Sequence, residues 1–535
     1  MTSSRSLLSV AGLTALLLGQ SLPAAEPPAG ADISPVKPQI HDSGLADHWA
    51  QQGVFMEILV RAYQDSNGDG IGDLNGLTQR LDYLKSLGIT GIWLLPIYRS
   101  ADHDHGYAVA DYRDIEPDYG TLADFDRLIA EAHKRGIGVI LDYVINHSAD
   151  THPLFMAANQ DAASPWRNWY VWKNSKPTGW QTYGGDPWYA GKAGGYYYGA
   201  FAPSMPDFNF RNPDVLAFHL DNLRFWLNRG VDGFRFDAVG ALVENGPNAW
   251  EGQPENHNIM RQVHDLLNRY GKRYMVAEAP AYPAEFSGSD SAGSAFAFGL
   301  QNAILKSVQM GRVMDTLPAY LKQKPVASMG TFLSNHDSFA GPRVAQQLGE
   351  DLPSQQLAAA TLLTLPGIPF LYYGEEIGQT FSEPVKWDDQ RLRGPMSWDD
   401  SANAGFSTAK PFRTLAQNHA TANVAAENGK PGSLLETYRA LIALRKAQPA
   451  LQTGALRILS DDDDPVFVFV REQGKTQILV ALNYSRRAAD AALPAAWQGQ
   501  WQLLYTNAKP GNVQLKSDKI NLAAQQAAIF IKTAP

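Results

Sequence analysis

Short apolar segments alternate with amphipathic segments from about residue 54 to residue 375, and this alternation limits the possible folds more than any other feature. The apolar segments predict strands at 54–60, 91–95, 138–144, 233–238, 274–277, 331–333 and 368–372, and the amphipathic ones include helices at 77–87, 122–135, 215–229 and 259–270. Strands that alternate with helices indicate βαβ units and a parallel sheet. Seven or eight units over about 320 residues predict an α/β fold of the (β/α)8 TIM barrel type, with a doubly wound sheet as the alternative.

The same pattern divides the chain into domains. Residues 45–147 and 209–450 are assigned to the barrel, and residues 148–208, which are rich in Trp and Tyr and show no clear helix, to a small domain inserted after the third strand. Its aromatic rings fit equally a surface that stacks on sugars or a small core. Within 451–535, strand-like segments at 466–470, 477–482, 501–505 and 528–531 predict a C-terminal antiparallel β-sandwich.

The N-terminus has the layout of a secretory signal peptide over residues 1–25. Arg5 precedes an apolar run at 7–18, and small residues follow at 23–25. The run is short for a membrane span, although an uncleaved anchor is the alternative. We therefore expect an exported protein, periplasmic or extracellular, that has no membrane segment after cleavage and is a monomer. Residues 26–44, rich in Pro, Ala and Gly, predict a linker.

Charge and cysteine content exclude several classes of function. The 45 Lys and Arg residues against 54 Asp and Glu give a net charge of -9, without a basic stripe, so no nucleic-acid partner is expected. The chain has no cysteine, which excludes disulfides, thiolate metal sites and cysteine nucleophiles. Serine-hydrolase elbows, zinc-protease motifs and phosphate-binding loops are also absent from the sequence.

Charged and polar side chains end four of the predicted strands. They are Asp142, Asn146 and His147 after the third strand, Arg235 and Asp237 in the fourth, Glu278 after the fifth, and Asn335, His336 and Asp337 after the seventh. Each taken singly fits a structural ion pair or a helix cap. Because a barrel brings the C-terminal ends of its strands together, the four ends predict one active site.

Three carboxylates without a cluster of metal-binding histidines suit glycoside hydrolysis, which uses one carboxyl as acid/base and another as nucleophile or base. Arg235 precedes Asp237 by two residues and shares its face of the strand, so it would hold Asp237 ionised as a nucleophile requires. Glu278 lies between two alanines, a drier setting that would raise its pKa as a general acid requires.

The other strand-end residues complete this hypothesis. Asp337 is expected to stay charged and to stabilise an oxocarbenium-like transition state. His147 and His336 are expected to donate hydrogen bonds to sugar hydroxyls.

In order and spacing, these strand ends resemble the conserved regions of the α-amylase family, glycoside hydrolase family 13. The resemblance covers most of residues 45–535 and is nearest to the oligo-1,6-glucosidase, α-glucosidase-like and neopullulanase-like branches. It implies that Asp237 is the nucleophile, Glu278 the acid/base and Asp337 the third carboxylate. It also implies a retaining mechanism with a covalent glucosyl–Asp237 intermediate.

Three further motifs resemble loops of this family. Residues 104–107 resemble the loop whose Asp and Tyr line the first sugar subsite, 205–209 an extra conserved region at the end of the inserted domain, and 393–398 a loop of oligosaccharide-acting members. The substrate-binding residues predicted in this way and from the strand ends are Asp104, Tyr107, His147, Arg235, His336 and Arg393.

Residues 65–73 carry a separate motif, with oxygen-bearing side chains at alternate positions and Gly70 in the sixth place, which suits a Ca²⁺ loop. Gly76 stands where an EF-hand needs Glu, so the loop is not an EF-hand. It resembles a single-ion loop of the oligo-1,6-glucosidase-like branch. That resemblance implies one structural Ca²⁺ bound by Asp65, Asn67, Asp69, the carbonyl of Ile71 and Asp73. A metal-free Asn/Gly turn is the alternative.

The expected function is hydrolysis of α-1,4-glucosidic bonds in starch or malto-oligosaccharides by a retaining enzyme of the α-amylase type. In relatives, a small residue after the nucleophile, here Ala238, accompanies α-1,4 preference, and Val accompanies α-1,6 preference. The alternatives are an exo-acting α-glucosidase or oligo-1,6-glucosidase, and a glucosyl transferase or trehalose synthase. A non-catalytic carbohydrate-binding protein on an inactive barrel is the alternative from another class.

Overall fold

The computed structural model describes residues 26–382, 388–508, 513–516 and 518–533. The predicted signal peptide at 1–25 lies outside the described residues. Residues 26–44, the predicted linker, contain no helix or strand and run along helix α5 (Pro213–Asn228). There the carboxylate of Asp221 and the amide oxygen of Asn228 accept hydrogen bonds from the backbone of Val36 and Gln39 at 2.9 and 2.8 Å. This segment is therefore tied to the barrel.

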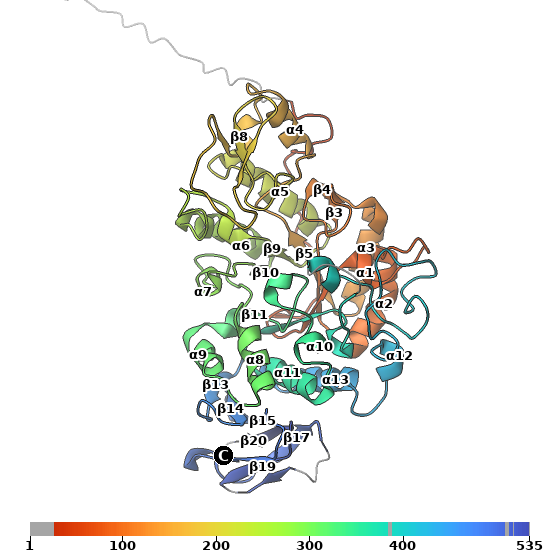
Figure 1. The fold of residues 1–535 in the computed structure, drawn as a ribbon, viewed down its shortest axis with the longest axis vertical. Coiled ribbons are helices and arrows are strands. Elements are labelled where there is room, and N and C mark those ends of the chain that lie inside the picture. The colour runs from red at the N-terminus through yellow and green to blue at the C-terminus, as the bar shows by residue number, and fades with distance from the viewer. Residues whose placement is uncertain (1–25, 383–387, 509–512, 517, 534–535) are drawn as a thin grey trace, which may run out of the picture.

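A parallel sheet of seven strands forms the centre of the molecule (Figure 1). In sheet order, the strands are β10 (Tyr274–Ala277), β9 (Gly233–Phe236), β5 (Gly138–Tyr143), β2 (Gly91–Leu94), β1 (Phe55–Ile58), β12 (Ile368–Tyr372) and β11 (Gly330–Thr331). Six of the seven predicted strand segments contain one of these strands, and the segment 331–333 overlaps β11 only at Thr331. The first strand, β1, pairs with the last, β12, so the sheet curls into a barrel and is not doubly wound.

Residues 295–296 occupy the remaining place in the barrel. Ala295 bridges Ala277 of β10, and Phe296 bridges Gly330 of β11, both in the parallel sense. The backbone hydrogen bonds from Phe296 to Ala277 and from Gly330 to Ala295 are each 3.0 Å long. This contact is only two residues long, and the short apolar run 295–298 in which it lies is not among the predicted strands.

Helices cover the outside of the barrel (Figure 1). The longer ones are α2 (Leu74–Leu87), α3 (Leu122–Lys134), α5, α6 (Pro254–Tyr270), α8 (Leu300–Met310), α9 (Thr316–Gln323), α11 (Leu352–Thr364) and α13 (Leu434–Ala447). The shorter ones are α1 (Val60–Tyr63), α7 (Pro283–Phe286), α10 (Val344–Gln347), α12 (Val424–Glu427) and α14 (Pro449–Thr453). The four predicted helices are present, and α6 begins earlier than expected because Pro254 suits a first turn.

The side-chain period of a strand explains how the barrel builds a polar site on an apolar interior. Alternate residues face the same side, so Ile140 and Asp142 of β5 share a face, as do Phe55 and Glu57 of β1. Phe55 and Ile140 belong to a buried cluster that also contains Trp93 of β2. Two residues beyond Phe55 and Ile140 the side chain is a carboxylate, Glu57 in β1 and Asp142 in β5, which places these charged groups at the C-terminal rim.

The inserted segment forms a small unit at the end of the molecule away from the C-terminal sheets (Figure 1). Its strands β6 (Trp172–Lys173), β7 (Trp188–Ala190) and β8 (Tyr196–Tyr198) form an antiparallel sheet in the order β6-β8-β7. The expectation that this segment lacks a helix is wrong, because α4 (Pro153–Gln160) lies within it. Eight residues are too few to produce a clear amphipathic pattern, and capping by His152 marks the start of α4.

The aromatic residues of this unit were expected to form either a small core or a surface that stacks on sugars. Most are core, since Trp166, Trp169, Trp188, Tyr197 and Tyr198 are at most 7% exposed. Trp172 and Trp180 are only partly buried.

Two antiparallel sheets form the C-terminal part and confirm the predicted β-sandwich (Figure 1). One contains β13 (Ala455–Ile458), β14 (Val466–Gln473), β15 (Thr476–Asn483), β20 (Ala527–Thr533) and β17 (Gln502–Thr506), in that order. The other contains β16 (Ala489–Ala492), β19 (Lys519–Leu522) and β18 (Gln514–Leu515). Val468 and Leu479 from the first sheet share a buried cluster with Ile520 and Leu522 from the second.

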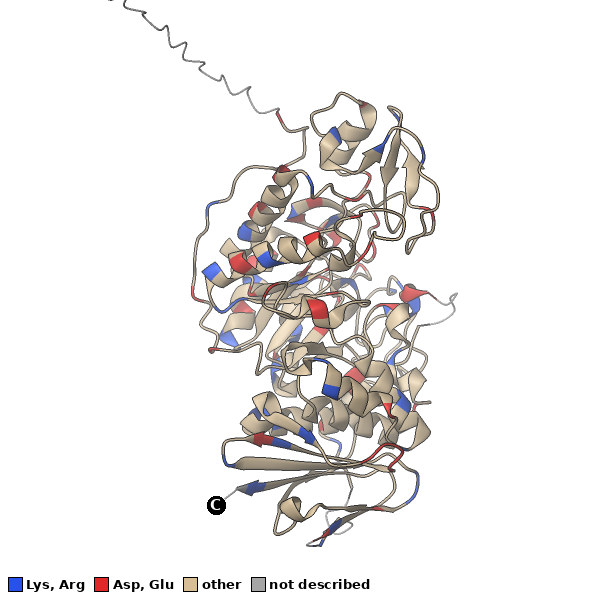
Figure 2. Cartoon of the chain, turned by 90° about the vertical axis from the view of Figure 1, so that its left-hand side faces the viewer, with Lys and Arg blue, Asp and Glu red and all other residues tan. Residues whose placement is uncertain are grey.

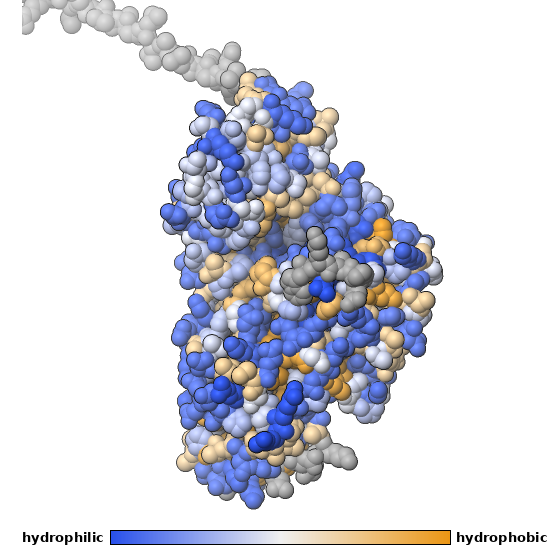
Figure 3. Space-filling model, in the orientation of Figure 1, coloured by the Kyte–Doolittle hydropathy of each residue, from blue (hydrophilic) through white to orange (hydrophobic). Residues whose placement is uncertain are grey.

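Acidic and basic residues are interspersed over the face of the molecule that Figure 2 shows. On the face of Figure 3, apolar residues gather in the middle of the molecule, below the inserted unit. Within the described residues, no helix combines the length and apolarity needed to span a bilayer.

Candidate active site

Arg235 of β9 holds together the carboxylates of three neighbouring strands. Its Nη1 atom lies 2.7 Å from Oδ1 of Asp142 and 2.7 Å from Oδ1 of Asp237, and its Nη2 atom lies 2.9 Å from Oε2 of Glu278. The guanidinium is 1% exposed, and its planar fork can serve several carboxylates at once. The convergence predicted for the ends of β5, β9 and β10 is therefore present.

Tyr107 links this cluster to the seventh strand end. It lies in the loop between β3 (Tyr98–Ser100) and β4 (Val109–Ile115), the hairpin that follows β2. Its hydroxyl donates to Oδ2 of Asp142 at 2.8 Å and lies 2.7 Å from Nε2 of His336. The two rings stack with centroids 5.6 Å apart. Tyr107 thus positions Asp142 and His336 relative to each other.

Glu57 of β1 supports the same histidine from below. Its Oε1 atom lies 2.5 Å from Nδ1 of His336. Tyr107 donates to Asp142, so its oxygen can accept from Nε2–H of His336, and Nδ1 of the neutral ring then accepts a hydrogen bond from the carboxyl of Glu57. Burial raises the pKa of Glu57 well above its usual value, which favours the protonated form of this carboxyl. His336 itself stays neutral, because burial and Arg393 lower its pKa.

Asp337 faces the cluster from the opposite side of the barrel. Nη2 of Arg393 donates to its Oδ1 at 2.9 Å, and Nε of Arg393 donates to the carbonyl of His336 at 3.0 Å. The sequence predicts a charged Asp337. Burial instead raises its pKa to about 7, in spite of the neighbouring Arg393. Asp337 is therefore partly protonated near neutral pH.

The pKa values of the other two carboxyls are arranged as the roles predicted for them require. Burial raises the pKa of Glu278 to about 7, and the attraction of Arg235 opposes this rise. Burial raises the pKa of Asp237 to about 6, with Arg235 again opposing it. Because the two groups interact, protons leave the pair in coupled steps, and Asp237 is the more readily ionised member. The pair offers a carboxylate and a carboxylic acid near pH 6.5.

Glu278 is also positioned by the backbone after the nucleophile strand. Ala238 has φ 48° and ψ 36°, the left-handed region, which is unusual for a residue other than glycine. This conformation turns its N–H toward Glu278, whose Oε2 accepts at 3.0 Å. Backbone strain at a strand end is a common feature of functional sites. Ala238 therefore has a structural role beside the acid.

Asp104 and Arg413 close one end of the site. Nη2 of Arg413 lies 2.8 and 3.0 Å from the two carboxylate oxygens of Asp104. Nη1 of the same guanidinium donates to the carbonyl of Arg393 at 2.9 Å. Arg413 thus ties the loop of Asp104 and Tyr107 to the loop that holds Arg393, beyond Tyr107 and Asp337.

An aromatic group lies on the other side, toward Glu278. Tyr183 from the inserted unit stacks on Phe201 at 5.1 Å and meets Trp250 edge-on at 4.8 Å. Its hydroxyl donates to Glu251, which lies with Trp250 in the loop after β9. Tyr183 is 53% exposed, and burial together with the acidic neighbours Glu251 and Glu278 raises its pKa. This group joins the inserted unit to the barrel.

His147 lies next to Phe201, with ring centroids 5.3 Å apart. Its Nε2 atom lies 3.2 Å from the carbonyl oxygen of Tyr107, so the residue is at the site as predicted. Burial lowers its pKa to about 4, and the ring is neutral at physiological pH.

The predicted calcium loop lies between α1 and α2. Gly68 and Gly70 have φ values of 83° and 92°, as tight turns require. The carboxylate of Asp65 accepts hydrogen bonds from the backbone of Gly68 and Gly70 at 2.7 and 2.8 Å, and Asp73 caps α2 by accepting from Gly76 at 2.8 Å.

Asn67 and Asp69 are exposed, and their side-chain oxygens accept hydrogen bonds from the backbone of Asp69 and Ile71 at 2.9 and 2.8 Å. No three acidic or histidine side chains in the described part of the chain are grouped as a metal site. Oxygen-only donors suit Ca²⁺, but the carboxylates of Asp65 and Asp73 already serve donors of the protein, so ion binding stays a prediction.

Sequence reasoning missed two residues of the site, Glu57 and Arg413. Asp142 was expected at the site, but no role was predicted for it. A carboxylate within the apolar first strand was a usable signal for Glu57, because buried charges need partners. Arg413 lies in a loop without a motif and could be found only from the structure.

Comparison with known proteins gives this geometry a family. Residues 57–454 match the family model for the α-amylase catalytic domain. An α-glucosidase from Pediococcus pentosaceus is 32% identical over 520 residues, which span 82% of this chain and 92% of the relative. An oligo-1,6-glucosidase from Parageobacillus thermoglucosidasius is 32% identical over 83% of this chain and 92% of its own. A trehalose synthase/amylase from Mycobacterium tuberculosis is 34% identical over 82% of each chain.

Solved structures agree with these relatives. The trehalulose synthase MutB from Pseudomonas mesoacidophila matches with a TM-score of 0.81 and 29% identity, over 90% of this chain and 99% of that one. An α-glucosyl transfer enzyme, XgtA, matches with a TM-score of 0.81 and 30% identity over the same shares. Family model, relatives and fold lead to one conclusion: the chain belongs to the α-amylase family, glycoside hydrolase family 13.

Proposed function

We propose that the protein is a retaining exo-acting α-glucosidase, which removes single glucose units from the non-reducing ends of short oligosaccharides. The α-amylase type that the sequence favours acts within long chains and needs a cleft open at both ends. The named relatives include an α-glucosidase and an oligo-1,6-glucosidase, which supports the alternative drawn from the sequence.

The observation that carries this proposal is the ion pair of Arg413 with Asp104. It spans two loops at the end of the site beyond Tyr107 and Asp337, where the chain of a polysaccharide would have to continue. A glucose unit that rests against Tyr107 therefore has no room for a further sugar on its non-reducing side. A pocket closed in this way selects chain ends.

The carboxyl pair supplies the chemistry. Glu278 would donate its proton to the glycosidic oxygen while the ionised Asp237 attacks the anomeric carbon, so that the leaving group departs as an alcohol and a glucosyl–Asp237 ester forms. Glu278, now ionised, would then take a proton from water, which attacks the ester and releases glucose with retained configuration. Asp337 and His336 would hold hydroxyls of the bound sugar.

The leaving group would lie against the aromatic group on the side of Glu278. The acid must be next to the glycosidic oxygen, so the departing sugar lies on its side of the pocket. Tyr183, Phe201 and Trp250 offer aromatic faces and edges there. A held acceptor sugar would compete with water for the intermediate, which supports glucosyl transfer or isomerisation as a second candidate. Relatives named trehalose synthase/amylase and trehalulose synthase add to this support.

Product analysis tests the proposal. Purified protein is incubated with maltose, maltotriose, isomaltose, sucrose and soluble starch, beside Asp237→Asn as the inactive control. Glucose as the first product from short substrates, with slow attack on starch, is the expected result. Mixed oligosaccharides released from starch would refute exo action. Trehalose or longer sugars from maltose would favour the second candidate, and no product at all would indicate a binding protein.

The proposal includes export and one structural Ca²⁺. Residues 1–25 support export, and N-terminal sequencing of protein secreted from a bacterial host should find the mature chain to begin after Ala24 or Ala25. Asp65, Asn67, Asp69 and Asp73, with the carbonyl of Ile71, would hold the ion, which would stabilise the turn between α1 and α2.

A further inference from the structure

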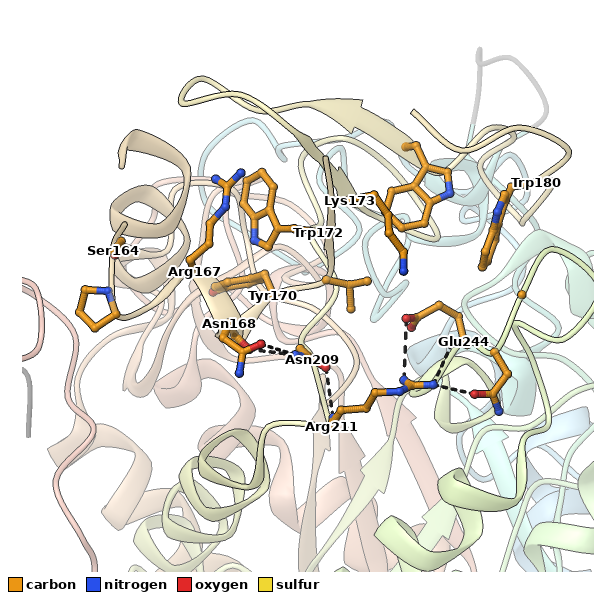
Figure 4. Close-up of a pocket in the computed structure, with 15 residues that line it drawn as sticks. Ser164, Arg167, Asn168, Tyr170, Trp172, Lys173, Trp180, Asn209, Arg211 and Glu244 are labelled. Atoms are coloured by element: carbon orange, nitrogen blue, oxygen red, sulfur yellow. Dashed lines mark hydrogen bonds and ion pairs between the residues drawn. The ribbon is translucent and has the colours of Figure 1, made fainter. Parts of the chain in front are cut away.

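A second cavity lies beneath the inserted unit, apart from the carboxylate cluster (Figure 4). Its volume is about 620 Å³, within the range of sites that bind small molecules. Its walls come from the strands of the inserted unit, from residues 209–211 before α5 and from residues 244–246 after β9. None of its lining residues belongs to the active site described above.

One aromatic ring of this cavity is available to a ligand. Trp188 is 2% exposed and belongs to a small core. Trp172 stacks on Phe155 and carries the guanidinium of Arg167 at 3.2 Å from its ring centre, so its ring is occupied. Trp180 is partly exposed and stands at 86° to Trp188. Figure 4 shows Trp180 at the edge of the cavity, beside Lys173.

Hydrogen-bond donors and an acceptor face each other below the ring of Trp180. In Figure 4 the amine of Lys173 extends into the cavity toward the carboxylate of Glu244. Within the described part of the chain, Lys173 has no ion pair. Arg211 donates to the carbonyl of Glu244 at 3.1 Å and to Oδ1 of Asn245 at 2.6 Å, and its Nη1 atom is 3.9 Å from Glu244. A donor and an acceptor are thus held apart with space between them.

Sugar hydroxyls fit such an arrangement better than other ligands. A hydroxyl both donates and accepts, so one diol can satisfy Lys173 and Glu244 together. The apolar face of a pyranose packs on an exposed indole, and cavities of this kind combine few polar groups with aromatic walls. A cation would be repelled by Lys173 and Arg211.

We propose that this cavity is a second saccharide-binding site, which holds one glucosyl unit against Trp180 with its hydroxyls between Lys173, Glu244 and Arg211. The choice of an α-glucoside as its ligand rests on the function proposed above. The site would retain oligosaccharides near the enzyme without taking part in bond cleavage.

The test is a titration of the full-length Asp237→Asn protein with maltotriose, followed by saturation-transfer NMR and calorimetry. Two classes of site are expected, and Trp180→Ala in the same background should remove one of them or weaken it about tenfold. Glu244→Gln, which keeps the shape of the side chain, should weaken the same class. Lys192→Met, an exposed change on the inserted unit outside the cavity, is the control and should leave both classes intact.

Identical titrations for Asp237→Asn with and without Trp180→Ala or Glu244→Gln would overturn the proposal. If Trp180→Ala does not fold, the titration is made with Trp180→Phe, which keeps an aromatic ring. In the wild-type background, Trp180→Ala should leave kcat on 4-nitrophenyl α-glucoside unchanged. Loss of kcat would place the cavity within the active site and also overturn the proposal. Trp180-dependent binding by a protein without turnover would instead contradict the proposed function alone.

Discussion

Replacing Glu278 by Gln tests the link between burial and acid catalysis. With a pKa of about 7, Glu278 is about half protonated at pH 7, whereas a carboxyl at the usual 4.5 would be roughly 0.3% protonated. Burial therefore makes the acid form roughly 150-fold more abundant at that pH. Since Asp237 must be ionised and its pKa is about 6, kcat/KM should rise through pH 6 and fall above pH 7.

The assay is kcat/KM from pH 4 to pH 9 on maltose and on 2,4-dinitrophenyl α-glucoside. Glu278→Gln should lower kcat on maltose about 10²- to 10⁴-fold and abolish the alkaline limb of the profile. The dinitrophenyl substrate needs no protonation of its leaving group, so its glycosylation step should be nearly unaffected. Glu427→Gln is the matched control, because burial also raises the pKa of Glu427 to about 7 but this residue lies at α12. An unchanged alkaline limb in Glu278→Gln, or equal losses on both substrates, would refute the reasoning.

Three further predictions concern specificity, pH and the metal. Arg413→Ala should open the pocket and raise the preference for maltopentaose over maltose, measured as the ratio of kcat/KM, on the order of tenfold. Arg413→Lys should change this ratio less. An unchanged ratio in Arg413→Ala would remove the argument for exo action. Burial raises the pKa of Glu375 to about 8, so the stability that this residue contributes is complete below pH 4.5 and is lost as the pH rises to 8. The free energy of unfolding, measured in urea at pH 5 and pH 8, should therefore decrease less between these pH values for Glu375→Gln than for the wild type. An equal decrease in both proteins would contradict this reasoning. Chelation should lower the Tm of the wild type but not of Asp65→Ala, and no shift after prolonged chelation would count against a bound ion.

The barrel could be predicted because its signal is local. Strands covered on both faces read as short apolar runs, and all seven runs overlap strands of the sheet, although the run 331–333 shares only Thr331 with β11. The eighth place at residues 295–296 was missed, because a contact of two residues within the four-residue apolar run 295–298 is too short to stand out as a strand. Helix α4 was missed for a similar reason: its length gives only two turns.

The sequence by itself determined which groups end the strands, and hence that Arg235, Asp237, Glu278 and Asp337 meet at one rim. Strand periodicity and barrel closure bring these groups together whatever the loops do. Only the tertiary structure decided how strongly each group is desolvated, and this burial raises the pKa of Asp337 to about 7. The tertiary structure alone also brought Arg413 onto Asp104, across 309 positions of chain. Desolvation and loop contacts depend on residues distant in sequence, which no local pattern records.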